Sequence, residues 1–291
     1  MSHLIDSSTC TRCRLCVTIC PSGILAINEA GEIISRPDRT DICVTCGHCM
    51  AVCETRSIRV NGLEYGKELA PLQENTVDYT TFRNFLLTRR SVRHFRDQEV
   101  PLDLLQRIAD TFALAPYGMS PENVSIAIVT GRDRIREALP AISNMYLQLG
   151  KMLGIAPMRW LMRRMMTAQD ADTIFRLIYP HVKKGLYDYS KEDDISREAP
   201  AMLLIHGPKN AGEHTTDGMI GTTYAFLAAH ALGLGATVIG LIGPGINRNK
   251  KLKELYGIPP ENEVIQTIIV GYPKYRFKHA IVRPRNVTVI S

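Results

Sequence analysis

Eight cysteines constrain this chain more than any other feature of its sequence. All eight lie between Cys10 and Cys53, and none follows Cys53. They form two runs of identical spacing, first Cys10, Cys13, Cys16 and Cys20 and then, at a constant offset of 33, Cys43, Cys46, Cys49 and Cys53. The same offset aligns Leu25 with Ile58 and Ile27 with Val60. The first sixty residues are therefore an internal duplication, in which a short apolar strand follows each cysteine run.

The spacing of each run is that of an iron–sulfur ligand set. Three cysteines two residues apart hold one [4Fe-4S] cluster, and the fourth ligates the neighbouring cluster. This rule assigns Cys10, Cys13, Cys16 and Cys53 to cluster one, and Cys20, Cys43, Cys46 and Cys49 to cluster two. The alternative is a pair of zinc sites, but zinc favours paired C-x-x-C units that close a tetrahedron. Residues 1–62 resemble a bacterial two-[4Fe-4S] ferredoxin.

The composition limits the cellular compartment and the classes of ligand that we expect for this chain. Cysteines gathered at one end, after an N-terminus without an apolar signal segment, favour metal ligation in a reducing cytoplasm over disulfides. Residues 218–247 contain no Lys, Arg, Asp or Glu, but their seven glycines and Pro244 favour a buried helix, turn and strand over a membrane span. The net charge of +6 is mild, and 18 Phe and Tyr with one Trp do not indicate nucleic-acid binding.

The remainder of the chain predicts an α+β domain. Asp78 and Pro101 each mark the start of a helix, and further helices are expected over residues 218–232 and 247–256. Apolar runs predict four core strands, at residues 124–130, 201–206, 237–242 and 264–270. The expected organisation is a ferredoxin domain over residues 1–62, a linker over 63–77 and an α+β domain over 78–291.

Residues 141–190 carry no strand pattern and hold six of the eleven methionines. Methionine is adaptable and is common at binding surfaces that accept varied ligands. We interpret this segment as a helical lid inserted over a substrate pocket. The alternative is an inserted helical pair with an ordinary core.

Four motifs after residue 78 resemble the nitroreductase family of FMN oxidoreductases. They are the basic string R-R-S-V-R-H-F at 89–95, the loop A-P-Y-G at 115–118, the glycine turn G-L-G-A-T-V-I-G at 233–240, and G-Y-P at 271–273 before a basic tail. Guanidinium groups bind phosphate in a bidentate fork, which suits the basic string to a phosphate site. The whole chain resembles ferredoxin–nitroreductase fusions of anaerobes.

The resemblance implies an FMN site and a homodimer with FMN bound across its interface. It assigns the FMN phosphate and ribityl chain to Arg89, Arg90, Ser91 and Arg93, with the late basic residues Arg283 and Arg285. It places Pro116, Tyr117, Gly118 and Ser120 beside the flavin ring, and the N–H groups near Ile239, Gly240 and Leu241 on the ring edge. Ser120 and Val124 depart from the family's usual asparagine and tryptophan.

The combination predicts an iron–sulfur flavoprotein reductase. Electrons from a ferredoxin-like or flavodoxin-like donor would pass through two [4Fe-4S] clusters to FMN. The acceptor would be a small electrophile: a nitro compound, a quinone, an activated alkene or another flavin. No dinucleotide-binding G-x-G-x-x-G follows an expected strand, and no side chain stands out as a catalytic acid. The alternatives are an electron-transfer or flavin-handling protein without its own organic substrate, and a reductive dehalogenase or flavin-breakdown enzyme.

Overall fold

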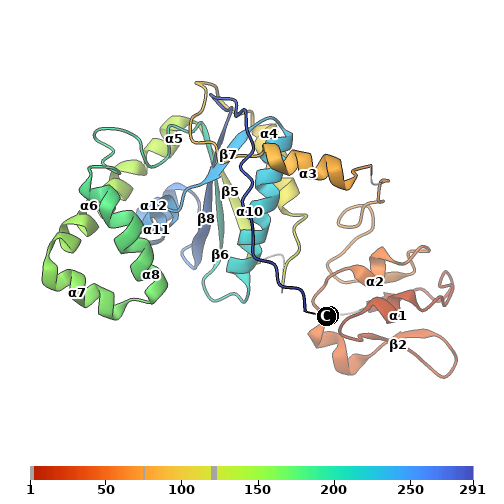
Figure 1. Cartoon of the computed structure of the whole chain (residues 1–291). Coiled ribbons are helices and arrows are strands. Elements are labelled where there is room, and N and C mark those ends of the chain that lie inside the picture. The colour runs from red at the N-terminus through yellow and green to blue at the C-terminus, as the bar shows by residue number, and fades with distance from the viewer. Residues whose placement is uncertain (1–2, 75, 119–122, 291) are drawn as a thin grey trace. The chain divides into compact units, whose positions relative to one another are not determined.

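The computed structural model describes residues 3–74, 76–118 and 123–290 (Figure 1). Their contacts divide the chain into two compact units, Met1–Val77 and Asp78–Ser291. Predicted site residue Ser120 lies outside the described residues. The two units differ in size and in the kind of core they contain.

The smaller unit is built from two antiparallel ribbons. Its elements are β1 (His3–Ile5), α1 (Leu15–Ile19), β2 (Leu25–Ile27), β3 (Ile33–Ser35), the 3-10 helix η1 (Pro37–Ile42), α2 (His48–Ala51) and β4 (Ile58–Val60). Strand β1 pairs with β4 and β2 pairs with β3. The predicted strands after the two cysteine runs, β2 and β4, therefore lie in different ribbons. Met50 and the inward residues of the four strands form a small common core.

The duplication is repeated in the backbone. Residues in the left-handed region recur in three pairs at the offset of 33: Arg12 and Thr45 (φ 56° and 53°), Arg14 and Gly47 (67° and 72°), and Gly23 and Arg56 (58° and 54°). Non-glycine residues adopt this region only where the surrounding fold holds them there. Both cysteine loops therefore follow the same path, as expected of an internal duplication.

The larger unit confirms the predicted α+β class. Its strands are β5 (Ser125–Thr130), β6 (Ala201–Pro208), β7 (Gly235–Val238) and β8 (Asn262–Gly271), in the sheet order β5-β6-β8-β7. These strands pair antiparallel. A parallel bridge between Ser91 and Ala236 adds the basic string to the β7 edge, so the sheet is mixed there.

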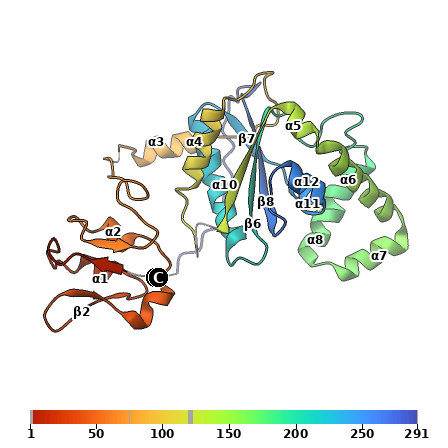
Figure 2. The same ribbon diagram turned by 180° about the vertical axis from the view of Figure 1, so that it is seen from behind.

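Helices cover both faces of this sheet (Figures 1 and 2). On one face, α4 (Leu102–Phe112) and α10 (His214–Ala231) pack on Leu203 and Ile205. On the other, α5 (Arg132–Arg136), α6 (Leu139–Gly154), α11 (Ile242–Asn247) and α12 (Lys250–Leu255) pack on Met202 and Leu204. Alternate residues of β6 thus face opposite layers, and all but the last are buried, as expected of a central strand.

The segment predicted as a helical insertion is helical in the structure. It contains most of α6, followed by α7 (Ala156–Met165), α8 (Ala168–Asp172), the π-helix η3 (Thr173–Ile178) and α9 (Tyr179–Lys183). Ser143 of α6 accepts a hydrogen bond from the N–H of Tyr189 and donates one to the carbonyl of Tyr187. These bonds close the segment onto its own first helix. Its role as a lid stays a prediction.

Two boundaries differ from the prediction. The strand expected at 237–242 is β7, which begins at Gly235 and ends at Val238, where its pairing with Gly271 to Ile268 of β8 begins and ends. The helix expected at 247–256 is α12, which begins only at Lys250 because the Asn249 side chain accepts hydrogen bonds from the N–H groups of Lys251 and Leu252. Residues Ile242–Asn247 form a separate helix, α11, that was not predicted.

Helices α3 (Tyr79–Thr88) and α4 begin as the sequence indicates, with one difference. The Asp78 carboxylate caps α3 by accepting hydrogen bonds from the N–H groups of Thr80 and Thr81. Pro101 stands at the N-cap of α4 and not at its first helical position. In the described part of the chain, no helix is both long enough and apolar enough to cross a membrane.

Candidate functional site

Two small cavities of the smaller unit are lined by cysteines. The first is lined by Cys10, Cys13, Cys16 and Cys53, and the second by Cys20, Cys43, Cys46 and Cys49. Each cavity thus takes three cysteines from one run and the last cysteine of the other run. These are the two ligand sets predicted from spacing, and the structure brings each set together.

The fourth cysteine of each run lies in a matched setting. The N–H of Ile24 donates to Cys20 Sγ and the N–H of Ser57 donates to Cys53 Sγ, both at 3.3 Å, and the two pairs are again related by the duplication. Burial would raise the pKa of Cys53, but hydrogen bonds from Thr55, Ser57 and Ile58 outweigh it and lower the pKa. Such bonds stabilise a thiolate, which is the form that ligates iron.

The cavities fit cubane clusters better than single ions. Within the described ranges, no three His, Cys, Asp or Glu side chains are placed to hold one metal ion. Instead, four thiols surround each cavity, together with apolar side chains such as Ile58 and Leu25. Burial raises the pKa of Cys49 to about 11 in the absence of metal, so cluster binding there must displace the thiol proton.

The predicted flavin residues of the larger unit gather along the β7 edge. The basic string follows α3 and reaches β7 through the Ser91–Ala236 bridge. The N–H of Val92 donates to the carbonyl of Ala236, and the N–H of Arg96 donates to that of Tyr272. The basic string therefore runs beside both β7 and the end of β8.

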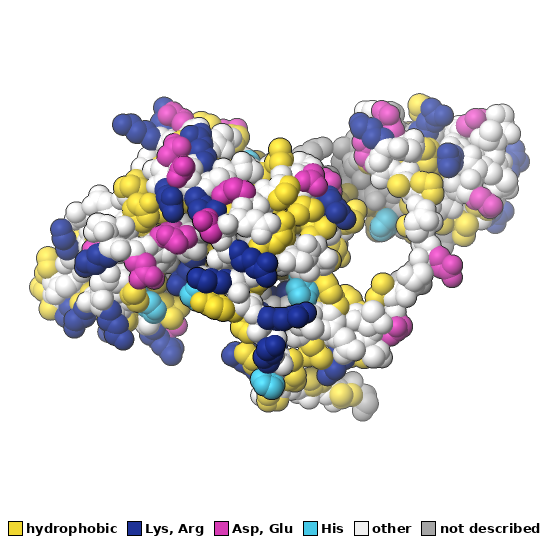
Figure 3. Space-filling view, turned by 90° about the horizontal axis from the view of Figure 1, so that it is seen from above, with side chains coloured by type: hydrophobic (Ala, Val, Ile, Leu, Met, Phe, Trp, Pro, Cys, Tyr) yellow, Lys and Arg dark blue, Asp and Glu magenta, His cyan; other side chains and the backbone are white. Residues whose placement is uncertain are grey.

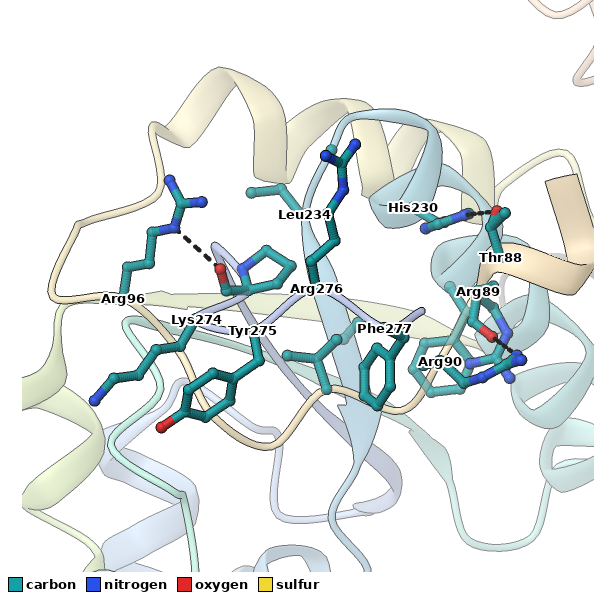
Figure 4. A pocket seen from close by; sticks show the side chains of 15 residues that line it. Thr88, Arg89, Arg90, Arg96, His230, Leu234, Lys274, Tyr275, Arg276 and Phe277 are labelled. Carbon is teal, nitrogen blue, oxygen red and sulfur yellow. Dashed lines mark hydrogen bonds between the residues drawn. The ribbon is translucent and has the colours of Figure 1, made fainter. Parts of the chain in front are cut away.

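A cationic cavity of about 570 Å³ opens at the start of this edge. Five of its residues are cations: Arg89, Arg90, Arg96, Lys274 and Arg276. Figure 4 shows Arg89 and Arg90 at one end and Arg96 and Lys274 at the other. The aromatic side chains of Phe226, Tyr275 and Phe277 also line it. Figure 3 shows Lys and Arg side chains gathered beside hydrophobic ones on the face of this unit turned to the viewer.

These cations have no acidic partners among the described residues. None of the five forms an ion pair within those ranges, and Arg90 Nε is buried there without a hydrogen-bond partner. Burial, with Arg90 nearby, lowers the pKa of Arg89. Uncompensated guanidinium groups favour a bound anion, so the cavity fits the phosphate of a flavin nucleotide.

Arg96, Lys274 and Arg276 were missed by the sequence reasoning. Lys274 and Arg276 follow the G-Y-P motif closely, and that motif was noted only as preceding a basic tail. The predicted tail residues Arg283 and Arg285 are exposed and do not line the cavity. Arg93 is also exposed and lies outside the cavity lining.

The loop after β7 presents backbone donors. The N–H of Ile239 donates to the carbonyl of Thr267 at 2.9 Å, so the structure does not leave it available to a flavin. Gly240 is exposed, and the N–H groups of Gly240 and Leu241 donate to no other described residue. Of the three predicted donors, these two can face a ligand.

The loop predicted beside the flavin ring lies elsewhere in the same chain. Pro116 and Tyr117 line a second cavity of about 290 Å³, between α4, β5 and the start of α10. The N–H of Gly118 donates to Asp217 Oδ1 at 2.8 Å. Sequence reasoning missed Asp217, which anchors this loop. One chain therefore does not bring Pro116 and Tyr117 to the cavity lined by Arg89 and Arg90.

Comparison with known proteins finds a match for each of the two units. Residues 86–272 match the nitroreductase family model, and residues 2–54 match the 4Fe-4S dicluster domain model. An uncharacterized ferredoxin of Methanocaldococcus jannaschii is 36% identical over 62 residues, which are 21% of this chain and 95% of that protein. The coenzyme F420-dependent sulfite reductase of the same organism is 36% identical over 67 residues, 22% of this chain and 9% of the reductase.

The larger unit has more distant relatives. Iodotyrosine deiodinase 1 of Mus musculus is 24% identical over 212 residues, 70% of this chain and 66% of that protein. The chain thus spans less than two thirds of the length of both this deiodinase and the sulfite reductase. The crystal structure of a nitroreductase with bound FMN from Bacteroides fragilis aligns with a TM-score of 0.55 at 18% identity, covering 72% of this chain and 98% of that one.

The nitroreductase model runs from residue 86 to residue 272 and so accounts for more than half of the chain and most of the larger unit. The cysteine cavities and the dicluster match account for the smaller one. The chain belongs to the nitroreductase family and carries a 4Fe-4S dicluster domain at its N-terminus.

Proposed function

We propose that the chain is an FMN-dependent reductase whose flavin is fed through its own two clusters. The supporting observation is the union, in one chain, of two four-cysteine cavities with a nitroreductase-family domain. A [4Fe-4S] cluster carries single electrons, and FMN converts single electrons into two-electron chemistry. A ferredoxin-like or flavodoxin-like protein is the donor that this arrangement suits.

FMN is assigned to the β7 edge of the larger unit. Arg89 and Arg90 would hold its phosphate in the cationic cavity, with Ser91 and Arg93 following along the edge. The N–H groups of Gly240 and Leu241 would donate to the flavin ring edge. Fixed donors at that position tune the electronic properties of a flavin. FMN-bound crystal structures of the same fold support this choice of nucleotide.

The chain is proposed to act as a homodimer that completes the flavin site. The cavity of Pro116 and Tyr117 is separate from that of Arg89 and Arg90 within one chain. The C-terminal tail exposes a set of large apolar side chains, from 58% to 93% accessible: Tyr275, Phe277, Ile281, Val282, Val287, Val289 and Ile290. Such exposure is unusual for a monomer, and a partner subunit would cover it.

The acceptor is proposed to be a small electrophile, with nitro compounds, quinones, activated alkenes and flavins as the classes to test. Reductive dehalogenation is the second candidate, favoured by the similarity to a deiodinase over 70% of this chain. The match to the sulfite reductase covers only 22% of this chain and does not inform the choice of acceptor.

Anaerobic turnover tests the proposal. Holoenzyme is mixed with a reduced bacterial ferredoxin, and each acceptor class, including a halogenated phenol, is supplied in turn. The proposal expects acceptor reduction that requires both the protein donor and bound FMN, with electrons consumed in multiples of two per product molecule. No reduction of any acceptor, together with rapid electron exchange between two carrier proteins, would assign the chain to electron transfer without an organic substrate.

A further inference from the structure

The two cysteine cavities are matched by the duplication, and their differences are therefore informative. Strand pairing extends the correspondence beyond the cysteine runs. Ile33 pairs with Ile27 in one ribbon, and His3 pairs with Val60, the counterpart of Ile27, in the other. The N–H of Arg36 donates to Ile24 and that of Asp6 donates to Ser57 in the same relation. His3 and Ile33 therefore occupy equivalent positions.

Each of these two residues lines one of the two cavities. Ile33 lines the cavity of Cys10, Cys13, Cys16 and Cys53, and His3 lines that of Cys20, Cys43, Cys46 and Cys49. Both are buried, at 6% and 8% accessible. The duplication thus places an imidazole beside one cluster cavity where it places a hydrocarbon beside the other.

The imidazole is aimed at a cluster ligand. His3 Nε2 lies 3.5 Å from Cys43 Sγ. Nδ1 is buried and has no partner among the described residues. A metal-bound thiolate only accepts hydrogen bonds, so the contact requires the proton on Nε2.

We propose that His3 donates a hydrogen bond from Nε2 to the Cys43 thiolate and thereby raises the reduction potential of the cluster in that cavity. Reduction adds negative charge to a cluster, and hydrogen bonds to its sulfurs stabilise that charge. In protein that has gained one electron, His3 therefore shifts the equilibrium distribution of that electron from the cluster in the Cys10 cavity toward the cluster in the Cys43 cavity. The inference rests on cluster loading of the smaller unit and not on the identity of the acceptor.

Other differences between the halves also act on the cluster potentials and dictate the design of the test. In the first cavity the Thr55 hydroxyl lies 3.7 Å from Cys53 Sγ. Arg14 lines the first cavity where Gly47 lines the second, and its charge is exposed and screened by salt. His48 lines the second cavity where Leu15 lines the first, and it is exposed. The potential of one cluster must therefore be followed before and after a change.

The test uses anaerobic holoprotein and four variants. His3→Ile copies the residue of the other half and removes the donor, whereas His3→Gln keeps an N–H donor. Ile33→His adds the imidazole to the first cavity. His48→Leu is the control, since it copies Leu15 and removes the other histidine that lines the second cavity. Potentials are measured by redox titration followed by EPR, with iron counted in each sample.

Pulsed EPR of protein labelled with ¹⁵N-histidine identifies the cluster that is coupled to an imidazole. We expect that coupling to vanish in His3→Ile and persist in His48→Leu. The cluster that loses the imidazole coupling should have a lower reduction potential. We expect a change of about 59 mV, which is about a tenfold change in the equilibrium constant for a one-electron couple. His3→Gln should recover most of the shift, and the other cluster should not move.

Two results would overturn the inference. One is a fully loaded His3→Ile protein in which neither potential moves, or in which both move together. The other applies if the His3→Ile protein does not load two clusters. In that case Ile33→His is the test, and it should raise the potential of the first cluster and give that cluster an imidazole coupling. A first cluster with an unchanged potential would contradict the proposed effect. Failure to reduce any acceptor would bear on the proposed function alone.

Discussion

The Tyr146 hydroxyl donates a hydrogen bond of 2.9 Å to the carbonyl oxygen of Leu241. Tyr146 belongs to α6, the first helix of the methionine-rich segment, and Leu241 belongs to the loop after β7. Burial raises the pKa of Tyr146 well above its usual range, so it remains a donor throughout the neutral and mildly alkaline range. The helical segment is thus fastened to the loop whose N–H groups are assigned to the flavin.

Removing this bond should loosen the flavin loop. Tyr146→Phe leaves the half-buried Leu241 carbonyl without its donor, at a cost of about 1–3 kcal/mol. We expect weaker FMN binding and a lower midpoint of urea unfolding, measured by flavin fluorescence and circular dichroism. Tyr256→Phe is the matched control, because the Tyr256 hydroxyl donates to the carbonyls of Arg134 and Ile135 in the same core. It should lower stability and leave FMN affinity unchanged; equal losses of FMN in both variants would argue against a local role for Tyr146.

Cofactor analysis should find both kinds of prosthetic group. Two four-cysteine cavities predict about eight iron and eight sulfide per chain in anaerobically purified protein. The cationic cavity predicts FMN released intact by denaturation, because its arginines fit a terminal phosphate. Metal analysis by mass spectrometry checks the iron content, and chromatography of the released flavin identifies the nucleotide. Stoichiometric zinc without visible absorption, or FAD in place of FMN, would contradict the assignments.

The cationic cavity should account for part of the FMN affinity. Arg89→Gln or Arg90→Gln removes a charge-assisted hydrogen bond worth roughly 1.5–3 kcal/mol, or about one to two decades in Kd. Isothermal titration of flavin-free protein with FMN and with riboflavin measures the effect. The loss should appear with FMN and be small with riboflavin, which lacks the phosphate. Arg107→Gln, at an exposed position of α4 outside the cavity, serves as the control.

The C-terminal tail should be required for dimer formation and for FMN retention. Deleting residues 280–291 removes five of the exposed apolar side chains and both Arg283 and Arg285, but keeps the residues that line the cationic cavity. We expect a dimer to become a monomer in analytical ultracentrifugation and to lose FMN. A double variant, Arg283→Gln with Arg285→Gln, should stay dimeric and bind FMN more weakly. A full-length monomer that retains FMN would refute the proposed interface.

The sequence predicted the architecture well where periodic patterns carry the information. The cysteine spacing predicted the crossed grouping of Cys20 with Cys43 and of Cys53 with Cys10, because ligand reach depends on chain separation alone. Apolar runs located β6 and β8, the two central strands of the sheet. Asp78 marked the start of α3, because its carboxylate satisfies N–H groups in the first turn.

Other features depend on contacts between distant segments and were not predictable. The start of β7 at Gly235 depends on its pairing with the distant Gly271 of β8, which no local pattern reveals. Asp217 is recognisable as an anchor only once the distant Gly118 donates to it. The separation of Pro116 from Arg89 likewise follows from the tertiary fold, since a family resemblance names the residues without saying which subunit brings them together.

The most direct test asks whether the clusters feed the flavin. Cys46→Ala removes a ligand from one four-cysteine cavity and leaves the residues assigned to FMN unchanged. Stopped-flow absorbance compares FMN reduction by reduced ferredoxin with reduction by dithionite, in wild type and variant with matched flavin content. We predict that the rate with ferredoxin falls by about two orders of magnitude or more while the rate with dithionite is preserved. Equal slowing with both reductants, or an unchanged rate with ferredoxin, would contradict an electron path through the clusters.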